Sequence, residues 1–342
     1  MGRNQKLREA TNPNEGLEPA MKKRIWVAWE TQRRSIELSG RVGAKLFLFD
    51  VGGKMRYPKS MMGTLRAFLI ERPHIIFVQN PSMILATLAC LYQLVARVPV
   101  VVDRHTTFLL TRKYRNTPRI ILFKVLHRFT IQVAALTIVT NAFLARLVEK
   151  MGGRAFVLPD PLPRITKNHD VNLPPGRHIV LISSFGLDEP IDAVLNAMRK
   201  VNDPSIVLHI TGNYRKLGPD RIVNIPGNVK LTGFLPDQDF MDLISAVDAI
   251  MVLTTANYCM LCGCYEAVSV KKPLITSDKS VLREYFNDAL FVDNSTEAIA
   301  KAIQLLFENY DNIQQKVITM RDRINKQWEA RYQQLEQVLR AL

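Results

Sequence analysis

Short runs of apolar, β-branched residues alternate along the chain with longer stretches whose apolar positions recur at helical spacing. Strands spaced by helices are typical of βαβ units, which build a parallel sheet with helices on its faces. In the first half we expect strands at 24–30, 44–49, 74–78, 98–103, 136–139 and 155–158. The helical patterns between them span 33–42, 61–71, 82–97, 117–134 and 142–151.

A proline-rich stretch, 159–177, interrupts this alternation and contains five prolines with little periodicity. Such a segment is typical of a linker between domains. Beyond it we expect strands at 178–183, 206–211, 229–232, 249–253, 273–276 and 289–292, and helices at 189–201, 237–245, 263–270 and within 296–342. The sequence therefore predicts an α/β protein in which two Rossmann-like, doubly wound domains face a cleft.

Domain boundaries follow from the same pattern. Residues 1–20 are polar and are predicted to be a disordered leader before the first domain, 21–162. The linker is placed at 163–176 and the second domain at 177–310. The last helical segment, 311–342, is long enough to leave the second domain and pack back onto the first.

Positive charge is concentrated in one half of the chain. The 342 residues include 46 Lys and Arg and 31 Asp and Glu, a formal net charge of +15. Residues 1–170 hold 28 of the basic and 11 of the acidic side chains, so the excess lies there. We expect that half to face an anionic membrane surface, a phosphorylated substrate or nucleic acid. The sequence has no zinc-finger spacing, aromatic RNA-binding motif or basic zipper, which disfavours nucleic acid as a partner.

The densest basic segment, 112–128, interleaves six Lys and Arg with apolar residues. This composition is typical of an amphipathic helix at a membrane interface, and an ordinary helix packed on the sheet explains it about as well. The longest apolar stretch, 81–102, is broken by Arg97 and Pro99, so no transmembrane segment is expected. The sequence has no export signal and only four cysteines, so we expect a cytoplasmic protein, peripheral at the inner face of the cell membrane.

Neither half contains the glycine-rich motif of dinucleotide-binding enzymes or of P-loop proteins. The most informative segment is 245–278, in which a strand ends in a small, polar loop at 254–262. A helix is then expected to begin near Gly263 and to carry Glu266 in its first turn. The loop can turn N–H groups toward an anion, and Glu266 can accept hydrogen bonds from sugar hydroxyls. Complementing the helix dipole is the plainer role for Glu266.

This segment resembles the donor domain of GT-B nucleotide-sugar glycosyltransferases of the family 4 type. The resemblance extends from Met21 to the end of the chain. It implies a metal-independent hexosyltransferase that needs no cofactor, with a nucleotide diphosphate sugar as co-substrate. The positions that match the family pattern are Gly233, Leu235, Leu243, Asp248, Glu266, Ala267, Pro273, Ile275 and Ser277.

Three features depart from the family pattern. The first glutamate of the family's loop falls on Tyr258, and the glycine before the family's proline falls on Lys271. The Arg and Lys that usually hold the diphosphate are missing from 183–190, where hydroxyls, a glycine and a following helix remain to cradle phosphate. The donor-binding residues that the resemblance implies are Ser183, Ser184, Gly186, Asn213, Thr255, Asn257, Tyr258, Met260, Leu261 and Glu266.

A weaker resemblance is to the β-mannosyltransferase that acts on chitobiosyl-diphosphodolichol, in the segments 78–82, 102–106 and 183–191. That relative transfers mannose from GDP-mannose to a lipid-linked diphosphate sugar at a membrane. The resemblance implies a lipid-linked glycan acceptor, whose phosphates suit the basic first half.

Polar side chains at the expected strand ends of the first domain are candidates for the acceptor side. Asp103 and His105 follow a buried strand, and a histidine there can act as a catalytic base or orient the sugar. A structural contact between the two side chains is the alternative. The candidates for acceptor binding are Glu30, Arg33, Arg34 and Asn80. A solvated first helical turn explains the two arginines equally well.

No metal site is expected. Cys259, Cys262 and Cys264 lack a fourth ligand nearby in the sequence, and Asp237 and Asp239 are placed to begin a helix. The predicted function is transfer of a sugar from a nucleotide diphosphate sugar to a polyprenyl-diphosphate-linked glycan in surface polysaccharide synthesis. The alternatives are a non-catalytic GT-B scaffold that partners an active transferase, and a nucleotide-sugar epimerase.

Overall fold

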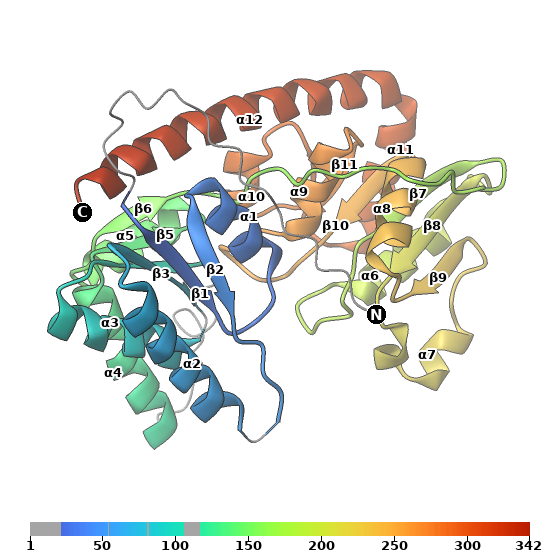
Figure 1. Cartoon of the computed structure of the whole chain (residues 1–342). Coiled ribbons are helices and arrows are strands. Elements are labelled where there is room, and N and C mark those ends of the chain that lie inside the picture. Colours follow the sequence, from blue (N-terminus) through green and yellow to red (C-terminus); the bar gives the residue numbers. More distant parts are fainter. Residues whose placement is uncertain (1–21, 54, 81, 106–116) are drawn as a thin grey trace, which may run out of the picture.

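The computed structural model describes residues 22–342 apart from 54, 81 and 106–116 (Figure 1). The expected leader and the first five residues of the basic segment 112–128 lie outside the described residues. Two six-stranded sheets form the centres of two domains, and neighbouring strands run parallel throughout both. The predicted α/β architecture with two Rossmann-like domains is confirmed.

The first sheet has the strand order β2-β1-β3-β4-β5-β6. Every residue of β3, β4 and β5, three of its four interior strands, is buried, which is why these strands are rich in apolar residues. The strands are β1 (Arg24–Ala28), β2 (Ala44–Leu48), β3 (Ile75–Asn80), β4 (Val100–Arg104), β5 (Leu136–Val139) and β6 (Ala155–Val157). The helices α2 (Arg56–Glu71), α3 (Met83–Ala96) and α4 (Pro118–Val133) cover one face, α1 (Arg33–Arg41) lies on the other, and α5 (Ala142–Lys150) packs on β5 and β6.

The second sheet has the order β12-β11-β10-β7-β8-β9. Its strands are β7 (Arg177–Leu181), β8 (Ile206–Thr211), β9 (Val229–Gly233), β10 (Ala249–Val252), β11 (Leu274–Ser277) and β12 (Leu290–Val292). The helices α6 (Ile191–Lys200) and α11 (Thr296–Glu308) pack on one face. The other face carries α8 (Asp237–Ala246), α9 (Cys262–Ser269) and α10 (Ser280–Tyr285).

The last helix, α12 (Tyr310–Arg340), joins the two domains (Figure 1). Its first half buries Val317 and Met320 in the core of the second domain, and its second half buries Trp328 and Leu335 against the first sheet. Glu336 pairs with Arg24 of β1 through two hydrogen bonds of 2.8 and 3.0 Å. The chain thus returns to the first domain, as its length and apolar pattern predict.

Several boundaries differ from the sequence expectation. Helix α2 begins at Arg56 rather than 61, because Pro58 falls in its first turn, where its missing N–H breaks no helical bond. Helix α9 begins at Cys262, so Glu266 lies in its second turn and not in its first. The sequence reading missed α10 and two short helices between β8 and β9, η1 (Tyr214–Leu217) and α7 (Pro219–Val223). Among the described helices, none combines the length and the apolar character needed to cross a bilayer.

Candidate functional site

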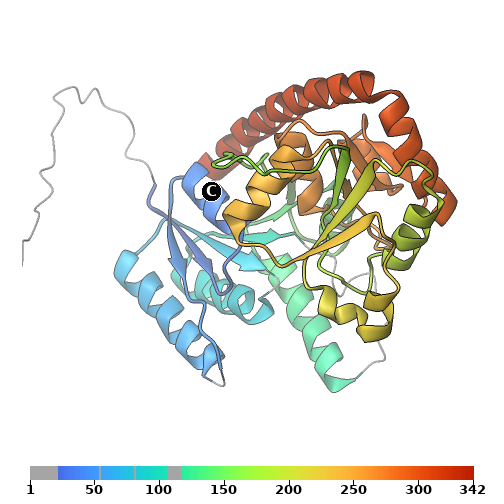
Figure 2. The same ribbon diagram turned by 90° about the vertical axis from the view of Figure 1, so that its right-hand side faces the viewer.

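The candidate site is the junction where the carboxyl ends of the two sheets face each other and residues of both domains are in contact, and we call this junction the cleft. Each sheet has one switch point, between β1 and β3 in the first and between β7 and β10 in the second. Ligands of open α/β sheets bind at such points. Figure 2 shows the two domains side by side beneath α12. Arg33, at the start of α1, contacts Glu266 of α9, so the two switch regions face each other.

The loop after β7 arranges its donors around one carboxylate. Glu189 Oε1 accepts hydrogen bonds from Ser184 N (3.0 Å) and Ser184 Oγ (2.7 Å). Glu189 Oε2 accepts from Phe185 N (3.0 Å) and from Ser183 Oγ. Phe185 has φ 53°, and such turns form anion-binding concavities of N–H groups. Sequence reasoning assigned this cradle to the donor's phosphate, and the structure places the chain's own carboxylate in it.

The loop after β10 is tied to the loop after β7. Thr254 Oγ1 donates to Asp188 Oδ2 (2.8 Å), and Thr255 N donates to Asp188 O (2.6 Å). Gly212, at the end of β8, has φ 97°, and a Cβ there would lie 2.0 Å from Ser183 O. Only glycine allows this approach. The two loops and the end of β8 therefore form one hydrogen-bonded unit.

Tyr258 lies against the first domain. Its ring stacks on Phe143 of α5, with 3.6 Å between the ring centroids and 3° between the planes. Its carbonyl oxygen accepts a hydrogen bond from Asn141 Nδ2 (3.2 Å). Tyr258 has φ 61°, a left-handed conformation that is uncommon for a bulky residue. The aromatic ring thus joins the domains at the position of the family's carboxylate.

Glu266 makes a second contact across the cleft. Arg33 Nη1 lies 2.8 Å from Glu266 Oε1, and the Glu266 side chain is 12% exposed. Burial opposes the charge of Arg33, but the Glu266 carboxylate outweighs it, and the pKa of Arg33 is raised. The carboxylate expected to hold the ribose is therefore open to one side and already holds a cation from the opposite domain.

Behind the first switch point lies a buried ion pair. Asp103 is fully buried, and Arg34 Nε (3.0 Å) and Nη2 (2.8 Å) donate to its carboxylate. Burial would raise the pKa of Asp103, but Arg34 outweighs it and holds this pKa at about 2. Arg34 also donates to Asp160 and to Leu158 O (3.0 Å). Asp103 and Arg34 thus support the site from inside the domain, in contrast to the substrate contacts expected from the sequence.

His105 lies in front of this pair. Its side chain is 17% exposed, and its Nδ1 is 3.7 Å from Asp103 Oδ2, beyond hydrogen-bond distance. Within the described part of the chain, His105 Nδ1 has no hydrogen-bond partner. A partly exposed histidine with a buried carboxylate 3.7 Å away can act as a general base whose charged form the carboxylate stabilises.

Comparisons with known proteins agree with this architecture. Residues 25–159 match the family model described as "Glycosyl transferase 4-like domain", and residues 166–327 match "Glycosyl transferases group 1". The chain belongs to the GT-B glycosyltransferases of the family 4 type. A search of curated proteins gives no significant match.

Solved structures share the fold of this glycosyltransferase at low identity. The sucrose-phosphate synthase of Thermosynechococcus elongatus is 16% identical, with a TM-score of 0.74 over 94% of this chain and 99% of that chain. HepE of Anabaena in complex with UDP-glucose is 15% identical, with a TM-score of 0.69 over 93% and 92%. A putative UDP-N-acetylglucosamine 2-epimerase of Listeria monocytogenes is 13% identical, with a TM-score of 0.62 over 87% and 91%.

The other predicted site residues of the glycosyltransferase fall into distinct places. Glu30 pairs with Arg56 (2.6 Å), and Asn80 is buried at the end of β3. Asn213 accepts from Arg215 N (3.3 Å) and so caps η1. Asn257 is exposed in the loop after β10, and Gly186 is half-buried in the loop after β7. Met260 and Leu261 pack partly buried against the second core.

Sequence reasoning missed the residues that join distant segments. Phe143 and Asn141 reach Tyr258, more than a hundred positions along the chain, and no local pattern reveals such a contact. Asp160 lies in the proline-rich stretch 159–177, where the sequence predicts no site residue. Glu189 belongs to an acidic pair directly before Pro190 and a helix, which is visible in the sequence. The sequence does not indicate that its carboxylate binds the N–H groups of the loop after β7. Among the described residues, no group of three His, Cys, Asp or Glu is placed to hold a metal ion.

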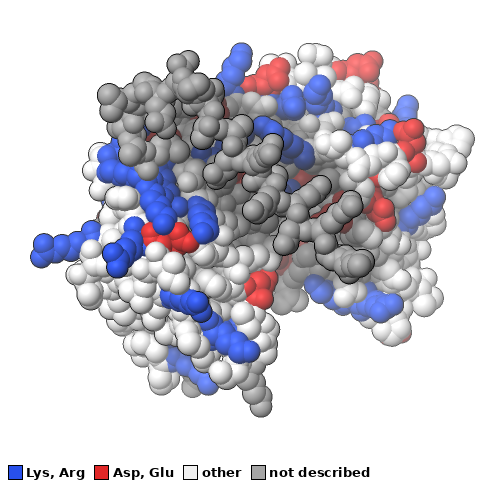
Figure 3. All heavy atoms as spheres, viewed as in Figure 1, with Lys and Arg blue, Asp and Glu red and all other residues white. Residues whose placement is uncertain are grey.

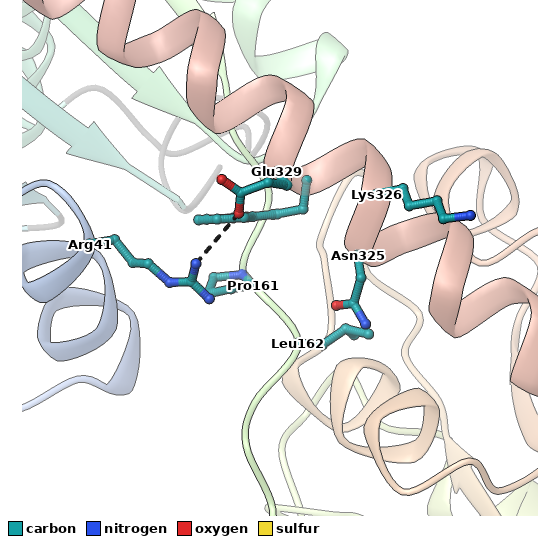
Figure 4. A pocket seen from close by; sticks show the side chains of 7 residues that line it. Arg41, Pro161, Leu162, Asn325, Lys326 and Glu329 are labelled. Atoms are coloured by element: carbon teal, nitrogen blue, oxygen red, sulfur yellow. Dashed lines mark ion pairs between the residues drawn. The ribbon is translucent and has the colours of Figure 1, made fainter.

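A cavity of about 380 Å³ lies outside the cleft, where α12 crosses between the domains (Figure 4). Arg41 stacks on Trp328, 4.9 Å from the ring centroid, and its Nη1 lies 3.5 Å from Glu329 Oε2. Trp328 Nε1 donates to Pro159 O (2.9 Å) of the linker. These contacts fix α12 against α1 and against the segment at Pro159, where α12 passes from the second domain to the first. The cavity is separate from the candidate site residues described above.

Proposed function

We propose that this glycosyltransferase moves a sugar from a nucleotide diphosphate sugar to a polyprenyl-diphosphate-linked glycan, in surface polysaccharide synthesis at the inner face of the cell membrane. One observation carries the proposal: Glu266 at the second switch point faces Arg33 at the first across the cleft, 2.8 Å apart. A nucleotide sugar on Glu266 would present its diphosphate and sugar to the first domain. HepE, which shares the fold, was solved with UDP-glucose.

Donor binding would rearrange this ion pair. A ribose whose hydroxyls donate to Glu266 takes the place of the Arg33 guanidinium, which is then free to pair with the diphosphate. The loops 183–190 and 254–261 contain no Lys or Arg, so they supply the diphosphate with no cationic side chain of their own. Lys216, whose Nζ donates to Ser184 O (2.7 Å), is a second cation at this edge.

His105 supplies the chemistry on the acceptor side. The acceptor hydroxyl oxygen forms a bond to the anomeric carbon, the bond from that carbon to the diphosphate breaks, and the hydroxyl proton passes to His105. Asp103 behind the ring stabilises the charge that then develops on the imidazole. Closure of the two domains excludes water, so the acceptor hydroxyl attacks instead of water.

The outer surface of α2, α3 and α4 fits an anionic membrane. The apolar side chains exposed on these helices are Tyr57, Met62, Leu65, Leu69, Ile70, Ile84, Leu91, Leu94, Val95, Ile121, Leu122 and Val125. The same helices and their ends carry Arg66, Arg97, Arg119 and Arg128, and Figure 3 shows Lys and Arg spread over the first domain. Apolar side chains among cations favour the interface of an anionic bilayer.

The test is transfer of radiolabelled sugar from a panel of UDP-, GDP-, TDP- and ADP-sugars to a polyprenyl-diphosphate-linked glycan. We expect transfer with one of these donors and a loss of about 10²- to 10⁴-fold in His105→Ala. His169→Ala, which removes an exposed histidine of the linker, is the matched control and keeps the rate. No transfer from any donor by a folded protein would contradict the proposal.

A second candidate function is a non-catalytic partner of an active transferase. Two observations favour it: Glu189 fills the cradle after β7, and Tyr258 is packed onto Phe143. Calorimetry separates the two functions, because a scaffold without a donor site binds neither UDP nor GDP. An epimerase would convert its nucleotide sugar without an acceptor, which product analysis detects.

A further inference from the structure

Arg104 is a buried cation without a counter-ion in the structure. It ends β4, directly before His105, and is 1% exposed. Its Nη1 lies 2.6 Å from His127 Nδ1, and its Nη2 donates to Thr130 Oγ1 (3.2 Å) of α4. Within the described residues, no carboxylate lies at ion-pair distance from it. Burial lowers the pKa of Arg104 to about 10, so the guanidinium keeps its charge at neutral pH. A buried charge without a partner is unfavourable.

Three polar atoms at and around Arg104 lack a hydrogen-bond acceptor among the described residues. Arg104 Nε, Asn80 Nδ2 and His127 Nε2 are all buried without a hydrogen-bond partner in the described structure. Asn80 is the register partner of Arg104 on β3, so both side chains leave the same face of the sheet. His127 Nδ1 accepts from Arg104, which places the proton of the neutral ring on Nε2. Each unpartnered atom is therefore a donor, and the group lacks an acceptor with negative charge.

We propose that Arg104, Asn80 and His127 bind a phosphate-type oxyanion. A phosphate offers several acceptor oxygens and a negative charge, and the planar guanidinium matches it through paired hydrogen bonds. A water molecule would accept some of the hydrogen bonds but would leave the charge of Arg104 uncompensated. The oxyanion supplies the hydrogen-bond acceptors and the compensating negative charge together.

The position of this site relates it to the exposed apolar side chains of the first domain. The neighbours of Arg104, His127 and Thr130, belong to α4, which exposes Ile121 and Leu122. A lipid-linked phosphate that reached Arg104 would have its apolar chain near the exposed side chains of α3 and α4. Assigning the oxyanion to the acceptor rests on the proposed function, whereas the site itself does not.

The test measures thermal unfolding of the full chain with inorganic phosphate, pyrophosphate and farnesyl diphosphate, and with sodium chloride at matched ionic strength. We expect the phosphates, but not chloride, to raise the unfolding temperature. In Arg104→Met the dissociation constant for pyrophosphate rises about 10- to 100-fold, because charge-assisted hydrogen bonds are lost. Arg146→Met, which removes an exposed arginine of α5, keeps the wild-type response.

Stability without ligand provides a second readout. Removing an unpartnered buried charge leaves the unfolding temperature of Arg104→Met unchanged or higher. Should that variant fail to fold, Asn80→Ala tests the same site and weakens pyrophosphate binding about fivefold to tenfold. A larger shift with farnesyl diphosphate than with pyrophosphate assigns the oxyanion to a lipid headgroup, and equal shifts assign it to a free phosphate.

The result that overturns the proposal is equal stabilisation of wild type and Arg104→Met by pyrophosphate, or no stabilisation of wild type by any of the phosphates. Neither measurement uses a sugar donor or a transfer reaction. Phosphate binding at Arg104 without sugar transfer would therefore refute the proposed function and support this site. Sugar transfer without phosphate binding at Arg104 would support the proposed function and refute this site.

Discussion

The first domain buries cations at the carboxyl ends of its strands, where Arg34 pairs with Asp103 and Arg104 lies against His127. In the second domain the loops after β7 and β10 contain no Lys or Arg, and Glu189 fills the N–H cradle of the loop after β7. Both sheets are parallel and have one switch point, although their strand orders differ: one strand (β2) lies beyond β1 in the first sheet, and two (β8 and β9) lie beyond β7 in the second. The difference lies in which charge each switch point presents to the cleft.

This contrast shows how a phosphorylated ligand can be held between the domains. Positive charge for a phosphate is available mainly from the first domain, whose Arg33 contacts Glu266 of the second domain. The second domain contributes a carboxylate, hydroxyls and backbone groups, which suit a ribose better than a diphosphate. Changes that alter the charges of one domain at a time test this division.

The largest expected effect is on the buried pair of the first domain. Asp103→Ala leaves the Arg34 guanidinium buried with Asp160 as its one ionic partner among the described residues, and we expect the free energy of unfolding to fall by about 3–5 kcal/mol. Denaturant unfolding measures this loss. Asp160→Ala, which removes the more exposed carboxylate, is the matched comparison and should cost less. A loss under about 1 kcal/mol in Asp103→Ala would contradict the description of this pair.

Acid should destabilise the second domain through a histidine pair. His178 Nδ1 lies 3.0 Å from His209 Nε2, and burial, His178 and Lys230 together lower the pKa of His209 from 6.5 to about 4. The unfolded chain therefore binds the proton more tightly, and this contribution to stability is complete above pH 6.5 and is lost as the pH falls toward 4. We expect a loss of about 3 kcal/mol, measured by denaturant unfolding across this range.

His209→Gln removes the titrating ring and serves as the control for that measurement. Its stability should change less between pH 6.5 and pH 4 than that of the wild type. Equal pH dependence of the two proteins would show that other groups cause the acid effect.

The carboxylate in the cradle after β7 comes next in magnitude. Glu189→Gln removes the charge that the Ser184 and Phe185 amides share, and we expect the free energy of unfolding to fall by about 1–2 kcal/mol. Asp192→Asn changes an exposed carboxylate of α6 and should have an effect under about 0.5 kcal/mol. An unchanged stability in Glu189→Gln would show that the cradle does not depend on this carboxylate.

The smallest expected effect concerns the position where the family has glycine. Lys271 follows Val270, the C-cap of α9, and has φ 58°. Lys272 N donates to Ala267 O (3.0 Å), as where a left-handed residue follows a helix. Glycine adopts this conformation without strain, so Lys271→Gly should raise the free energy of unfolding by up to about 1 kcal/mol. Lys272→Gly, at the following position, is the control, and it should not raise the temperature of thermal unfolding. Destabilisation by Lys271→Gly would contradict this explanation.

The sequence predicts the parts of this molecule that depend on local pattern. Buried strands such as β3 and β4 are continuous apolar runs, and Pro118 marks the start of α4, so the order of strands and helices follows from periodicity. Glu266 of α9 and His105 after β4 are candidates from the sequence because they follow strand ends, and the structure has both after those strand ends.

Contacts between distant segments were beyond such reasoning. The stack of Tyr258 on Phe143 depends on how the two domains face each other, and nothing near either residue in the sequence indicates it. Arg34 and Asp103 have the same polar character as exposed site residues, and only the packing of α1 on the sheet shows that they are buried. The lack of a partner for Arg104 appears only once its neighbours in space are known.

The most direct test of the account is calorimetric titration of the full chain with UDP-, GDP-, TDP- and ADP-sugars. The account predicts that one of them binds, that Glu266→Ala weakens this binding at least about tenfold, and that Arg33→Met weakens it about tenfold with little effect on stability. Binding that is equally tight in wild type and both variants, or no binding of any nucleotide sugar to the folded wild type, would contradict it.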